Sequence, residues 1–437
     1  MEDHKIITNF VISPYLIIER EKGTDPIHKL YNTLSGKAFQ VKETAMNILR
    51  FLEIPKTFEG IIAAFPQYPA EDLKQALSSF VNRGLVFQND ILEDQLVLLT
   101  RLKHSLFGLN DEINPDFANL CFVGIPYGGG NPKSIGCAYF PEKIREYANG
   151  YKLELNSQRL DNYCLEAVGI NSEQSAFSEL LQKDLIKDMG NLFVSIHESK
   201  SYIYRKIEKV AFQIFKQGNI PFFLGGDHSV TYPIVKAASA VFDELYLVHM
   251  DAHTDTYSSK YDSLQHPEKV HHHGNFASRC LEISNVKGVY QMGIRGIFNL
   301  MGRPYNTKQH IFWCSELKRA IQDKLEMPFI PEDASVYLTI DIDVLDPVVA
   351  PATATPVANG LHLSELIQLL QLVLSDRRII GVDLVEVNPD MDNQDRTMQT
   401  SIELILNVIN LFTLRDLSRE EPIGEHRKNV TPQLNNA

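Results

Sequence analysis

No long hydrophobic run occurs in this sequence. A membrane-spanning helix needs about 18 or more consecutive apolar residues, and the 437 positions contain no such run. The first residues, MEDHKIITNF, also lack the basic region followed by an apolar region that marks a secretory signal peptide. We therefore expect a cytoplasmic protein without a membrane partner.

Cysteine and positive charge are both scarce. The five cysteines are far apart and form no CxxC pair, which favours reduced core residues over a disulfide framework or a zinc site. The formal net charge is −13, and the clustered Lys and Arg that phosphate contacts require are absent. The composition argues against nucleic acid as a partner, and it makes a cationic partner electrostatically easier to attract.

Hydrophobic residues are plentiful, at 44%, and the length is enough for one large α/β domain with a small companion. The pattern changes near residue 110, from short strands and helices to a repeated strand, loop and helix. We predict four segments: a small domain at 1–95, a linker at 96–116, a catalytic domain at 117–416 and a polar tail at 417–437.

The small domain is predicted to have the element order β-β-α-α-α-β. Its strands are rich in β-branched and aromatic residues, and its helices carry apolar residues at helical spacing. The predicted strands are 13–20, 29–41 and 85–89, and the predicted helices are 41–53, 57–65 and 70–84.

This element order is a small winged-helix pattern, and it resembles the PqqD-like peptide-recognition domain used in the modification of ribosomally made peptides. Such domains bind a leader peptide as an added strand, so the resemblance implies an arginine-containing precursor peptide with a leader as partner. A structural cap or an oligomerisation module is the alternative. A DNA-binding wing fits poorly, because residues 73–84 carry few positive charges.

The large domain repeats buried strands with amphipathic helices between them. The helices 201–218 and 363–376 have apolar residues at the helical period, so a mostly parallel sheet covered on both faces is the economical assignment. We predict a three-layer α/β/α fold. The predicted strands lie within 118–130, 219–229, 244–253, 335–343 and 379–389.

Ionisable residues gather where three of these strands end. Positions i, i+2 and i+4 of an extended chain face the same way, and the carboxyl ends of parallel strands meet at one edge of a sheet. Burying so many ionisable groups costs several kcal/mol per unpaired charge, so the cluster predicts bound cations. The six residues are His228, Asp251, His253, Asp255, Asp341 and Asp343.

The donor set indicates which metal. Four carboxylates and two imidazoles without a thiolate favour hard divalent ions such as manganese. Four carboxylates nearly balance two such ions, and a pair of ions can activate a bridging hydroxide towards an electrophilic carbon. The sequence therefore predicts two Mn²⁺ per chain and hydrolytic chemistry.

Four motifs in order closely resemble the ureohydrolase family of arginases and agmatinases. The likeness extends from about residue 115 to about residue 415, and GCAYFPEKIREY at 136–147 adds to it. It implies an arginase-like fold and a homo-oligomer. An extra domain could block the contacts between subunits that are common in the family. The motifs are GGDHSVTYP (225–233), MDAHTD (250–255), TIDIDVLDPVVAPATATPV (339–357) and VDLVEVNP (382–389).

The resemblance also implies a role for each site residue. Glu386 accepts hydrogen bonds from a substrate guanidinium, with a strand-end salt bridge as the alternative. His273, in HHHGN, moves a proton to the leaving amine and contacts substrate, although the choice among His271, His272 and His273 stays open. Asp255 joins these two in the catalytic set. One ion is held by His228, Asp251, Asp255 and Asp341, and the other by Asp251, His253, Asp341 and Asp343.

One position departs from the arginases that act on the free amino acid. Tyr257 stands where those enzymes usually have an Asn that helps to bind the α-carboxylate, and the loop from Asp255 to His273 is longer. Tyr257 is therefore predicted to bind the distal end of a different substrate. With the small domain, this predicts a peptide arginase that converts peptidyl arginine to ornithine and urea. The alternatives are an agmatinase or other small-guanidine ureohydrolase, and a catalytically silent peptide-binding scaffold.

Overall fold

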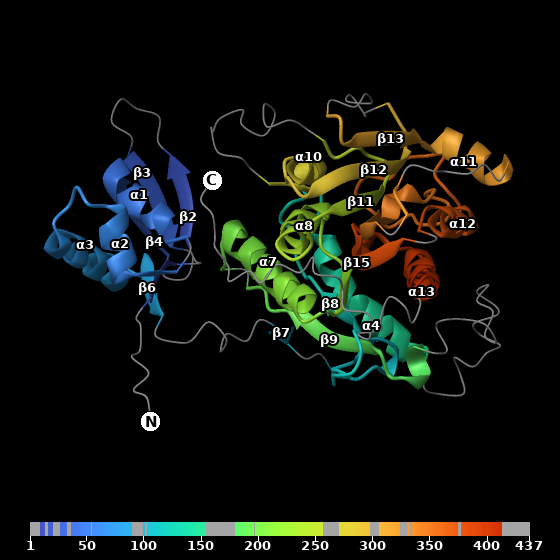
Figure 1. Ribbon diagram of the computed structural model, residues 1–437, viewed down its shortest axis with the longest axis horizontal. Coiled ribbons are helices and arrows are strands. Elements are labelled where there is room, and N and C mark those ends of the chain that lie inside the picture. Colours follow the sequence, from blue (N-terminus) through green and yellow to red (C-terminus); the bar gives the residue numbers. More distant parts are fainter. Residues whose placement is uncertain are drawn as a thin grey trace. The chain divides into compact units, whose positions relative to one another are not determined.

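The chain separates into two compact units (Figure 1). The N-terminal unit comprises Met1–Leu98 and Val194–Ile203, and the large unit comprises Leu99–Phe193 and Tyr204–Ala437. The computed structural model describes residues 9–13, 16–20, 27–32, 36–53, 55–89, 99–100, 103–153, 180–195, 197–256, 271–297, 306–323, 330–332, 334–374 and 377–412.

The N-terminal unit contains two small antiparallel sheets, of strand order β5-β1-β6 and β2-β3-β4, and three helices. The helix bounds are α1 Glu43–Phe51, α2 Phe58–Ala64 and α3 Ala70–Asn82. The strand bounds are β1 Asn9–Ile12, β2 Leu16–Arg20, β3 Ile27–Asn32, β4 Lys37–Lys42, β5 Lys56–Thr57 and β6 Val86–Asn89.

Apolar spacing explains why these segments form helices. In α3 the buried residues Leu73, Leu77 and Phe80 fall on one face, as a period of 3.6 residues requires. The Thr57 side chain accepts a 3.1 Å hydrogen bond from the Gly60 N–H and so caps the start of α2. The three predicted helices are confirmed, and the predicted strands 13–20 and 85–89 correspond to β2 and β6. The segment 29–41 holds two strands, β3 and β4, so the predicted order β-β-α-α-α-β is wrong and the observed order is β-β-β-β-α-β-α-α-β. Strands β1 and β5 are additional, because both are too short for an alternating pattern to reveal them.

The large unit is built on a nine-stranded sheet of order β13-β12-β11-β14-β15-β10-β8-β9-β7. Each neighbouring pair is parallel except β7 with β9. The strand bounds are β7 Leu99–Thr100, β8 Leu120–Gly124, β9 Ile186–Leu192, β10 Ile220–Leu224, β11 Leu245–Met250, β12 Val286–Ile294, β13 Gln309–Trp313, β14 Ser335–Asp341 and β15 Arg378–Val385.

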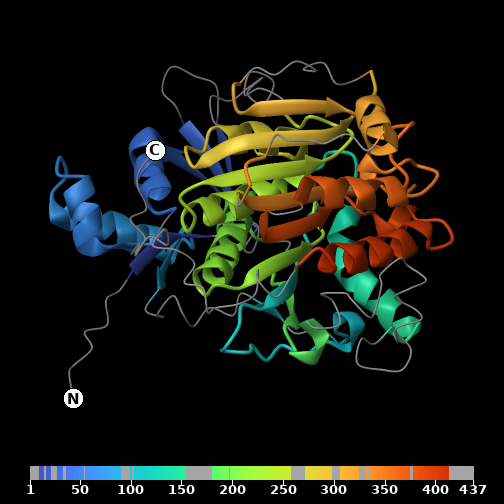
Figure 2. The ribbon, with the colours of Figure 1, turned by 45° about the vertical axis from the view of Figure 1, so that its right-hand side comes forward.

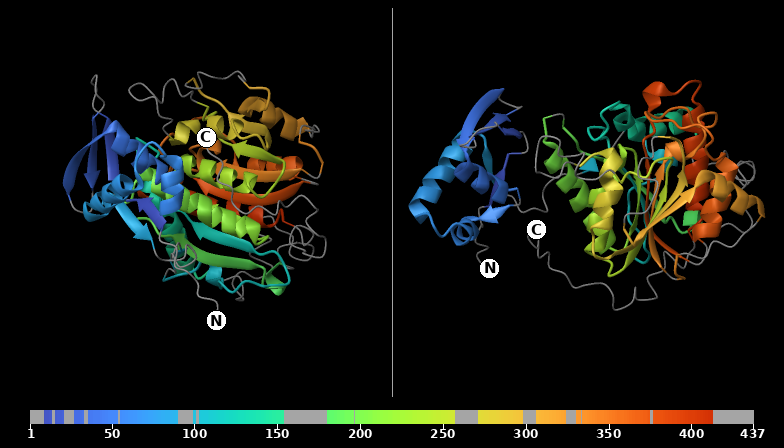
Figure 3. Two further views of the ribbon diagram at one scale, coloured as in Figure 1. Left: turned by 60° about the vertical axis from the view of Figure 1, so that its left-hand side comes forward. Right: turned by 90° about the horizontal axis from the view of Figure 1, so that it is seen from above.

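Helices cover both faces of this sheet. Helices α7, α8 and α10 lie on one face, and α4, α12 and α13 lie on the other (Figures 2 and 3). The predicted three-layer α/β/α arrangement is therefore confirmed. The helix bounds are α4 Phe140–Gly150, α7 Lys200–Lys216, α8 Thr231–Ser239, α10 Phe276–Leu281, α11 Cys314–Asp323, α12 Leu363–Leu374 and α13 Arg396–Ile409. Short 3₁₀ turns are η2 Leu106–Gly108, η3 Gly136–Tyr139, η5 His228–Val230, η6 His273–Asn275, η7 Ile342–Val344 and η8 Pro389–Met391.

The five predicted strands of the large unit are confirmed as β8, β10, β11, β14 and β15, which are apolar and buried. Strands β7, β9, β12 and β13 are additional, and in β9 Lys187 and Asp188 interrupt the apolar run. Both side chains are nevertheless buried, and the Arg145 guanidinium donates two hydrogen bonds, of 2.8 and 2.7 Å, to the Asp188 carboxylate. The polar residues make this strand unrecognisable from the sequence pattern. The ion pair with Arg145 lowers the free-energy cost of burying the Asp188 carboxylate.

No helix within the described residues is both long enough and apolar enough to span a lipid bilayer.

Candidate metal and active site

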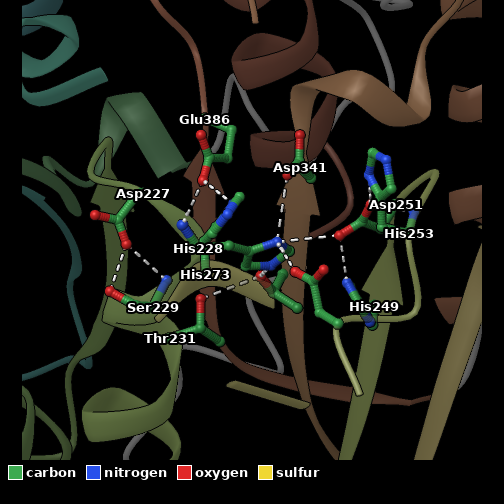
Figure 4. Close-up of polar contacts among 12 residues, drawn as sticks. Asp227, His228, Ser229, Thr231, His249, Asp251, His253, His273, Asp341 and Glu386 are labelled. Carbon is green, nitrogen blue, oxygen red and sulfur yellow. Dashed lines mark hydrogen bonds and ion pairs between the residues drawn. The ribbon is translucent and has the colours of Figure 1, made fainter. Parts of the chain in front are cut away.

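The carboxyl ends of four neighbouring strands, β11, β14, β15 and β10, carry the candidate site (Figure 4). Asp251 follows β11, Asp341 ends β14, Glu386 follows β15, and His228 follows β10 after a Gly-Gly turn. Both glycines of that turn, Gly225 and Gly226, have positive φ, at 78° and 88°, which the sharp exit from β10 requires. The parallel sheet thus brings residues far apart in sequence to one edge.

His228 lies at the centre of a first group of carboxylates. Its Nδ1 atom is 3.1 Å from Asp251 Oδ2, 3.3 Å from Asp255 Oδ2 and 3.4 Å from Asp341 Oδ2. The His228 side chain is fully buried, and Nδ1 makes no hydrogen bond. Three carboxylates at nearly equal distance from one ring nitrogen is an arrangement that a cation among them would stabilise.

A chain of hydroxyl groups faces the other nitrogen of His228. His228 Nε2 is 2.8 Å from Thr339 Oγ1, and Thr339 Oγ1 in turn donates to the buried Asp383 carboxylate. Asp383 also accepts hydrogen bonds from Thr231 and Tyr337, at 2.9 and 2.8 Å, so its carboxylate acts as the acceptor for all three hydroxyl groups. The Thr339 hydroxyl must therefore accept from His228 Nε2–H. In a neutral ring this leaves a lone pair on Nδ1, which points at the carboxylates.

His253 lies in a second group. Its Nδ1 is 3.0 Å from Asp343 Oδ2 and 3.4 Å from Asp251 Oδ1, and its side chain is 23% exposed. Backbone groups hold the two strand-end carboxylates in place: the Ala252 N–H donates to Asp343, at 3.0 Å, and the Asp343 N–H donates to Asp341, at 2.8 Å. Asp251 contacts both His228 and His253, so it is common to the two groups.

The buried carboxylates of the cluster need positive charge nearby to compensate their own. Burial raises the pKa of Asp341 and Asp343, and repulsion by neighbouring carboxylates raises it further. Burial disfavours the charged forms of the histidines. Asp251 and the other carboxylates around it nevertheless raise the pKa of His228 well above its usual value, and Asp343 and Asp251 raise that of His253 to about 12. Protons or metal ions can supply the missing charge. The oxygen-rich donor set with two imidazoles fits hard divalent cations, so the residues present suit the predicted metal.

Glu386 lies beside these groups and is held from several directions. Its Oε1 accepts from the His228 N–H at 3.0 Å and is 3.4 Å from His273 Nδ1. Its Oε2 accepts from Asn131 Nδ2 at 2.9 Å. Burial opposes its ionised form, but bonding to His273 and these donors lowers its pKa, so Glu386 is a carboxylate. Its φ is +60°, as is typical of strained functional residues, and Asp255 has a φ of +46°.

The three consecutive histidines have different surroundings. His271 stacks on Tyr232 with ring centroids 4.8 Å apart, and His272 precedes the 3₁₀ turn η6, where its N–H donates to Asn275 Oδ1 at 3.0 Å. His273 is the one beside Glu386. Burial disfavours its charged form, but bonding to Glu386 outweighs burial and raises its pKa. The geometry therefore favours His273 among the three as the group that holds a proton near Glu386.

Tyr257, the remaining predicted site residue, lies outside the described residues. All the other predicted site residues converge on one edge of the sheet. They are His228, Asp251, His253, Asp255, His273, Asp341, Asp343 and Glu386.

The sequence interpretation missed several polar residues that support the site. His249 Nε2 is 2.7 Å from Asp251 Oδ2. Its position two residues before Asp251 on the same strand could have revealed it, because alternate residues share a face. In the same way, Thr339 lies two residues before Asp341 on β14, and Asp383 lies two residues before the end of β15. No such periodicity marks Asn131, which lies in a loop after β8 and reaches Glu386 through the fold alone.

Comparison with known proteins agrees with this geometry. Residues 118–410 match the model of the Arginase family. An agmatinase of Neisseria meningitidis serogroup A is 34% identical over 308 residues, which cover 67% of this chain and 87% of the relative. The human mitochondrial guanidino acid hydrolase is 28% identical over 313 residues, covering 70% of this chain and 81% of that protein.

The fold is shared with solved structures as well. The crystal structure of a hypothetical agmatinase from Burkholderia thailandensis has a TM-score of 0.57 at 23% identity, covering 71% of this chain and 90% of that one. The segment Met1–Leu98 of the N-terminal unit lies outside the residues that match the family model. From its site motifs, its sheet and a match that covers most of the large unit, the chain belongs to the arginase family.

Proposed function

We propose that this protein hydrolyses a guanidino group, with water, to urea and the corresponding amine. One observation carries the proposal: His228 and His253 each lie within an acidic group, the two groups have Asp251 in common, and the Glu386 carboxylate lies next to them. A guanidinium needs a planar acceptor, and its central carbon needs a nucleophile beside that acceptor. A silent scaffold gives no reason to bury so much charge at one edge.

The residues of the two groups would hold two divalent cations, for which the donor set favours Mn²⁺. When bound, such a pair supplies Lewis acidity and lowers the pKa of a water molecule. Asp251 orients both histidines through its two oxygens. Thr339 fixes the ring of His228 from behind.

Glu386 and His273 act on the substrate itself. The Glu386 carboxylate accepts hydrogen bonds from the guanidinium N–H groups and orients the carbon that water attacks. His273 Nδ1 lies near Glu386 Oε1, where a proton can be held and passed to the leaving amine. The cleaved bond joins the guanidino carbon to the alkyl nitrogen, which leaves with that proton.

A small alkyl guanidine of the agmatine type is the substrate that the comparisons favour. Relatives that align with the large unit are named agmatinase and guanidino acid hydrolase.

Peptidyl arginine is a second candidate, and an exposed strand of the N-terminal unit supports it. Among the described residues β2 pairs with β3 alone, so its other edge offers backbone groups to an added strand. Ile17 and Ile18 on β2 are 56% and 40% exposed, and Tyr31, opposite Ile17, is 46% exposed. An apolar, unpaired strand edge suits an extended peptide such as a leader.

Urea release separates the two candidates. Purified protein loaded with Mn²⁺ would be incubated with agmatine, a 4-guanidino acid, free arginine and arginine-containing peptides. We expect urea from at least one of these, and the ratio of kcat/KM values then assigns the class. A protein that binds two Mn²⁺ ions but releases no urea from any of them would contradict the proposed function.

A further inference from the structure

Asn131 reaches into the site from the Gly-rich loop after β8, and its orientation is fixed. The side chain is buried, at 4% exposure. Its Oδ1 accepts a 2.9 Å hydrogen bond from the Lys133 backbone N–H, which can only donate. The Nδ2 amide must therefore face Glu386, to whose Oε2 it donates at 2.9 Å. The direction of this bond follows from the contacts.

The two oxygens of Glu386 are thus held by two different turns. The turn after β10 supplies the His228 N–H to Oε1, and the loop after β8 supplies the Asn131 amide to Oε2. One donor alone would leave the carboxylate free to rotate about its last side-chain bond. Two donors fix its plane, and Oε2, which accepts from Asn131, keeps a further lone pair for a guanidinium N–H.

The same loop also positions His273. The His273 N–H donates to Gly130 O at 3.2 Å, and the Gly130 N–H donates to Asp227 Oδ2 at 2.6 Å. Gly130 has no room for a side chain, because a Cβ there would lie 2.3 Å from Ser229 Oγ and 2.4 Å from Asp227 Oδ1. Neighbouring residues of one tightly held loop therefore set the places of both Glu386 and His273.

We propose that Asn131 is a positioning residue for guanidinium recognition, which acts by orienting the Glu386 carboxylate. The inference rests on the proposed function, since it takes Glu386 as the guanidinium acceptor. It assigns to the loop at Gly128–Asn131 a part in substrate orientation. A carboxylate with its plane fixed binds a planar cation more tightly than one that can rotate, and it holds the guanidino carbon in line for attack.

The test compares Asn131→Asp with Asn131→Ala in the full-length, Mn²⁺-loaded protein. Asp has the shape of Asn but cannot donate from either oxygen when ionised, and it faces another carboxylate. Asn407→Ala is the control, because Asn407 is a similarly buried amide that bonds within α13. The measurements are kcat and KM for the best guanidine substrate, inhibition constants for guanidinium chloride and for the amine product, and Mn²⁺ content.

We expect Asn131→Asp to lower kcat/KM by about 10- to 100-fold, and Asn131→Ala by the same factor or less, as for loss of a hydrogen bond to a charged group. The inhibition constant for guanidinium should rise by a similar factor, whereas that for the amine product, which has no guanidinium, should change by less than about twofold. Asn407→Ala should leave all of these values and the Mn²⁺ content as in the unmodified protein.

Two results would overturn the inference while leaving the proposed function standing. If Asn131→Asp behaves like the unmodified protein and only Asn131→Ala loses activity, Asn131 merely fills space. If the loss of activity follows a loss of Mn²⁺, or guanidinium and amine weaken alike, the loop acts through the metal groups or the fold. An unmodified protein that releases no urea from any guanidine would contradict both proposals.

Discussion

The two units bury different kinds of residue. Among the described residues of the N-terminal unit, the buried polar ones are few, namely Ser13, His28 and Asn32, and its core is otherwise apolar. The large unit buries a whole set of charged groups at one edge of its sheet, Asp251, Asp341 and Glu386 among them. Apolar packing stabilises both units, but it gives no reason to bury carboxylates side by side.

This difference shows which feature of each unit indicates its function. In the large unit the free-energy cost of burying charge marks the site directly, and the chemistry of the donors indicates the ligand. The described residues of the N-terminal unit hold no such group of buried carboxylates, and the informative feature there is the edge of β2 that no described strand pairs with. Substitutions of the site residues in the large unit should therefore affect every substrate, and substitutions on β2 should affect only substrates that reach it.

The largest effect is expected when a shared carboxylate is removed. Asp251→Ala and Asp341→Ala should abolish urea release and the binding of two metal ions, because Asp251 contacts both histidines and Asp341 contacts His228 and the Asp343 backbone. Elemental analysis and urea assays measure both effects. The exposed Asp116→Ala is the matched control. Either variant with two tightly bound metals and normal turnover would show that the metal assignment is wrong.

The next effect separates metal binding from proton transfer. His273→Ala should keep both metal ions but lose rate by about 10² to 10⁴-fold, as for a general acid or base. His271→Ala should be much milder, because His271 stacks on Tyr232 instead of facing Glu386. Full activity of His273→Ala with full metal content would move the proton-transfer role to another group.

A smaller effect tests the hydroxyl chain behind His228. Thr339→Val removes the Oγ1 that accepts from His228 Nε2, and Mn²⁺ affinity should fall by about 10- to 100-fold. Thr339→Ser keeps the hydroxyl and should restore most of that affinity. Thr400→Val, which removes a buried hydroxyl on α13, is the control. Competition with a chelator measures the Mn²⁺ affinities. Equal affinities of Thr339→Val and Thr339→Ser would show that the hydroxyl does not support the metal site.

The smallest and most selective effect should come from the edge of β2. Ile17→Lys and Ile18→Lys should raise KM for a long arginine-containing precursor peptide, by about tenfold or more if captured peptide gains effective concentration, and leave a small guanidine unaffected. Ile113→Lys, at an exposed site of the large unit, is the control. Steady-state urea release measures each KM. Parallel changes for both substrates would favour a structural cap over peptide capture.

Point substitutions suit this test better than removal of the N-terminal residues. Leu106 and Phe107 lie within the predicted linker, and both are buried in the core of the large unit together with Leu120. Strand β7 likewise pairs with β9 of the large sheet. A chain that began at Asn114 would lose these contacts and would test stability instead of peptide binding.

Sequence reasoning succeeded where apolar runs mark buried strands. The runs before Asp251, Asp341 and Glu386 predicted strands whose carboxyl ends meet at one edge of the sheet. These regularities are local, so a sequence displays them. The predicted alternation of Asp251, His253 and Asp255 along an extended strand is wrong, because β11 ends at Met250 and Asp255 has a φ of +46°; the three residues converge through the loop that follows the strand.

It failed where a contact depends on the fold. The separation of 255 positions between Asn131 and Glu386 has no local signature, and a hydrogen bond joins them. Strand β9 carries charges that look exposed in the sequence, and their burial depends on partners that the fold supplies, Arg145 for Asp188 and Asp184 for Lys187. The edge of β2 is likewise visible only after pairing is known.

The most direct test of the account measures urea and metal together. Metal-free protein would be titrated with Mn²⁺ while urea release from agmatine and from an arginine-containing peptide is followed. We predict that urea production from at least one of them rises with metal content and reaches its maximum at two ions per chain, and that Glu386→Gln at the same metal content is strongly impaired. Two bound ions with no urea from any guanidine, or full turnover by Glu386→Gln, would contradict the account.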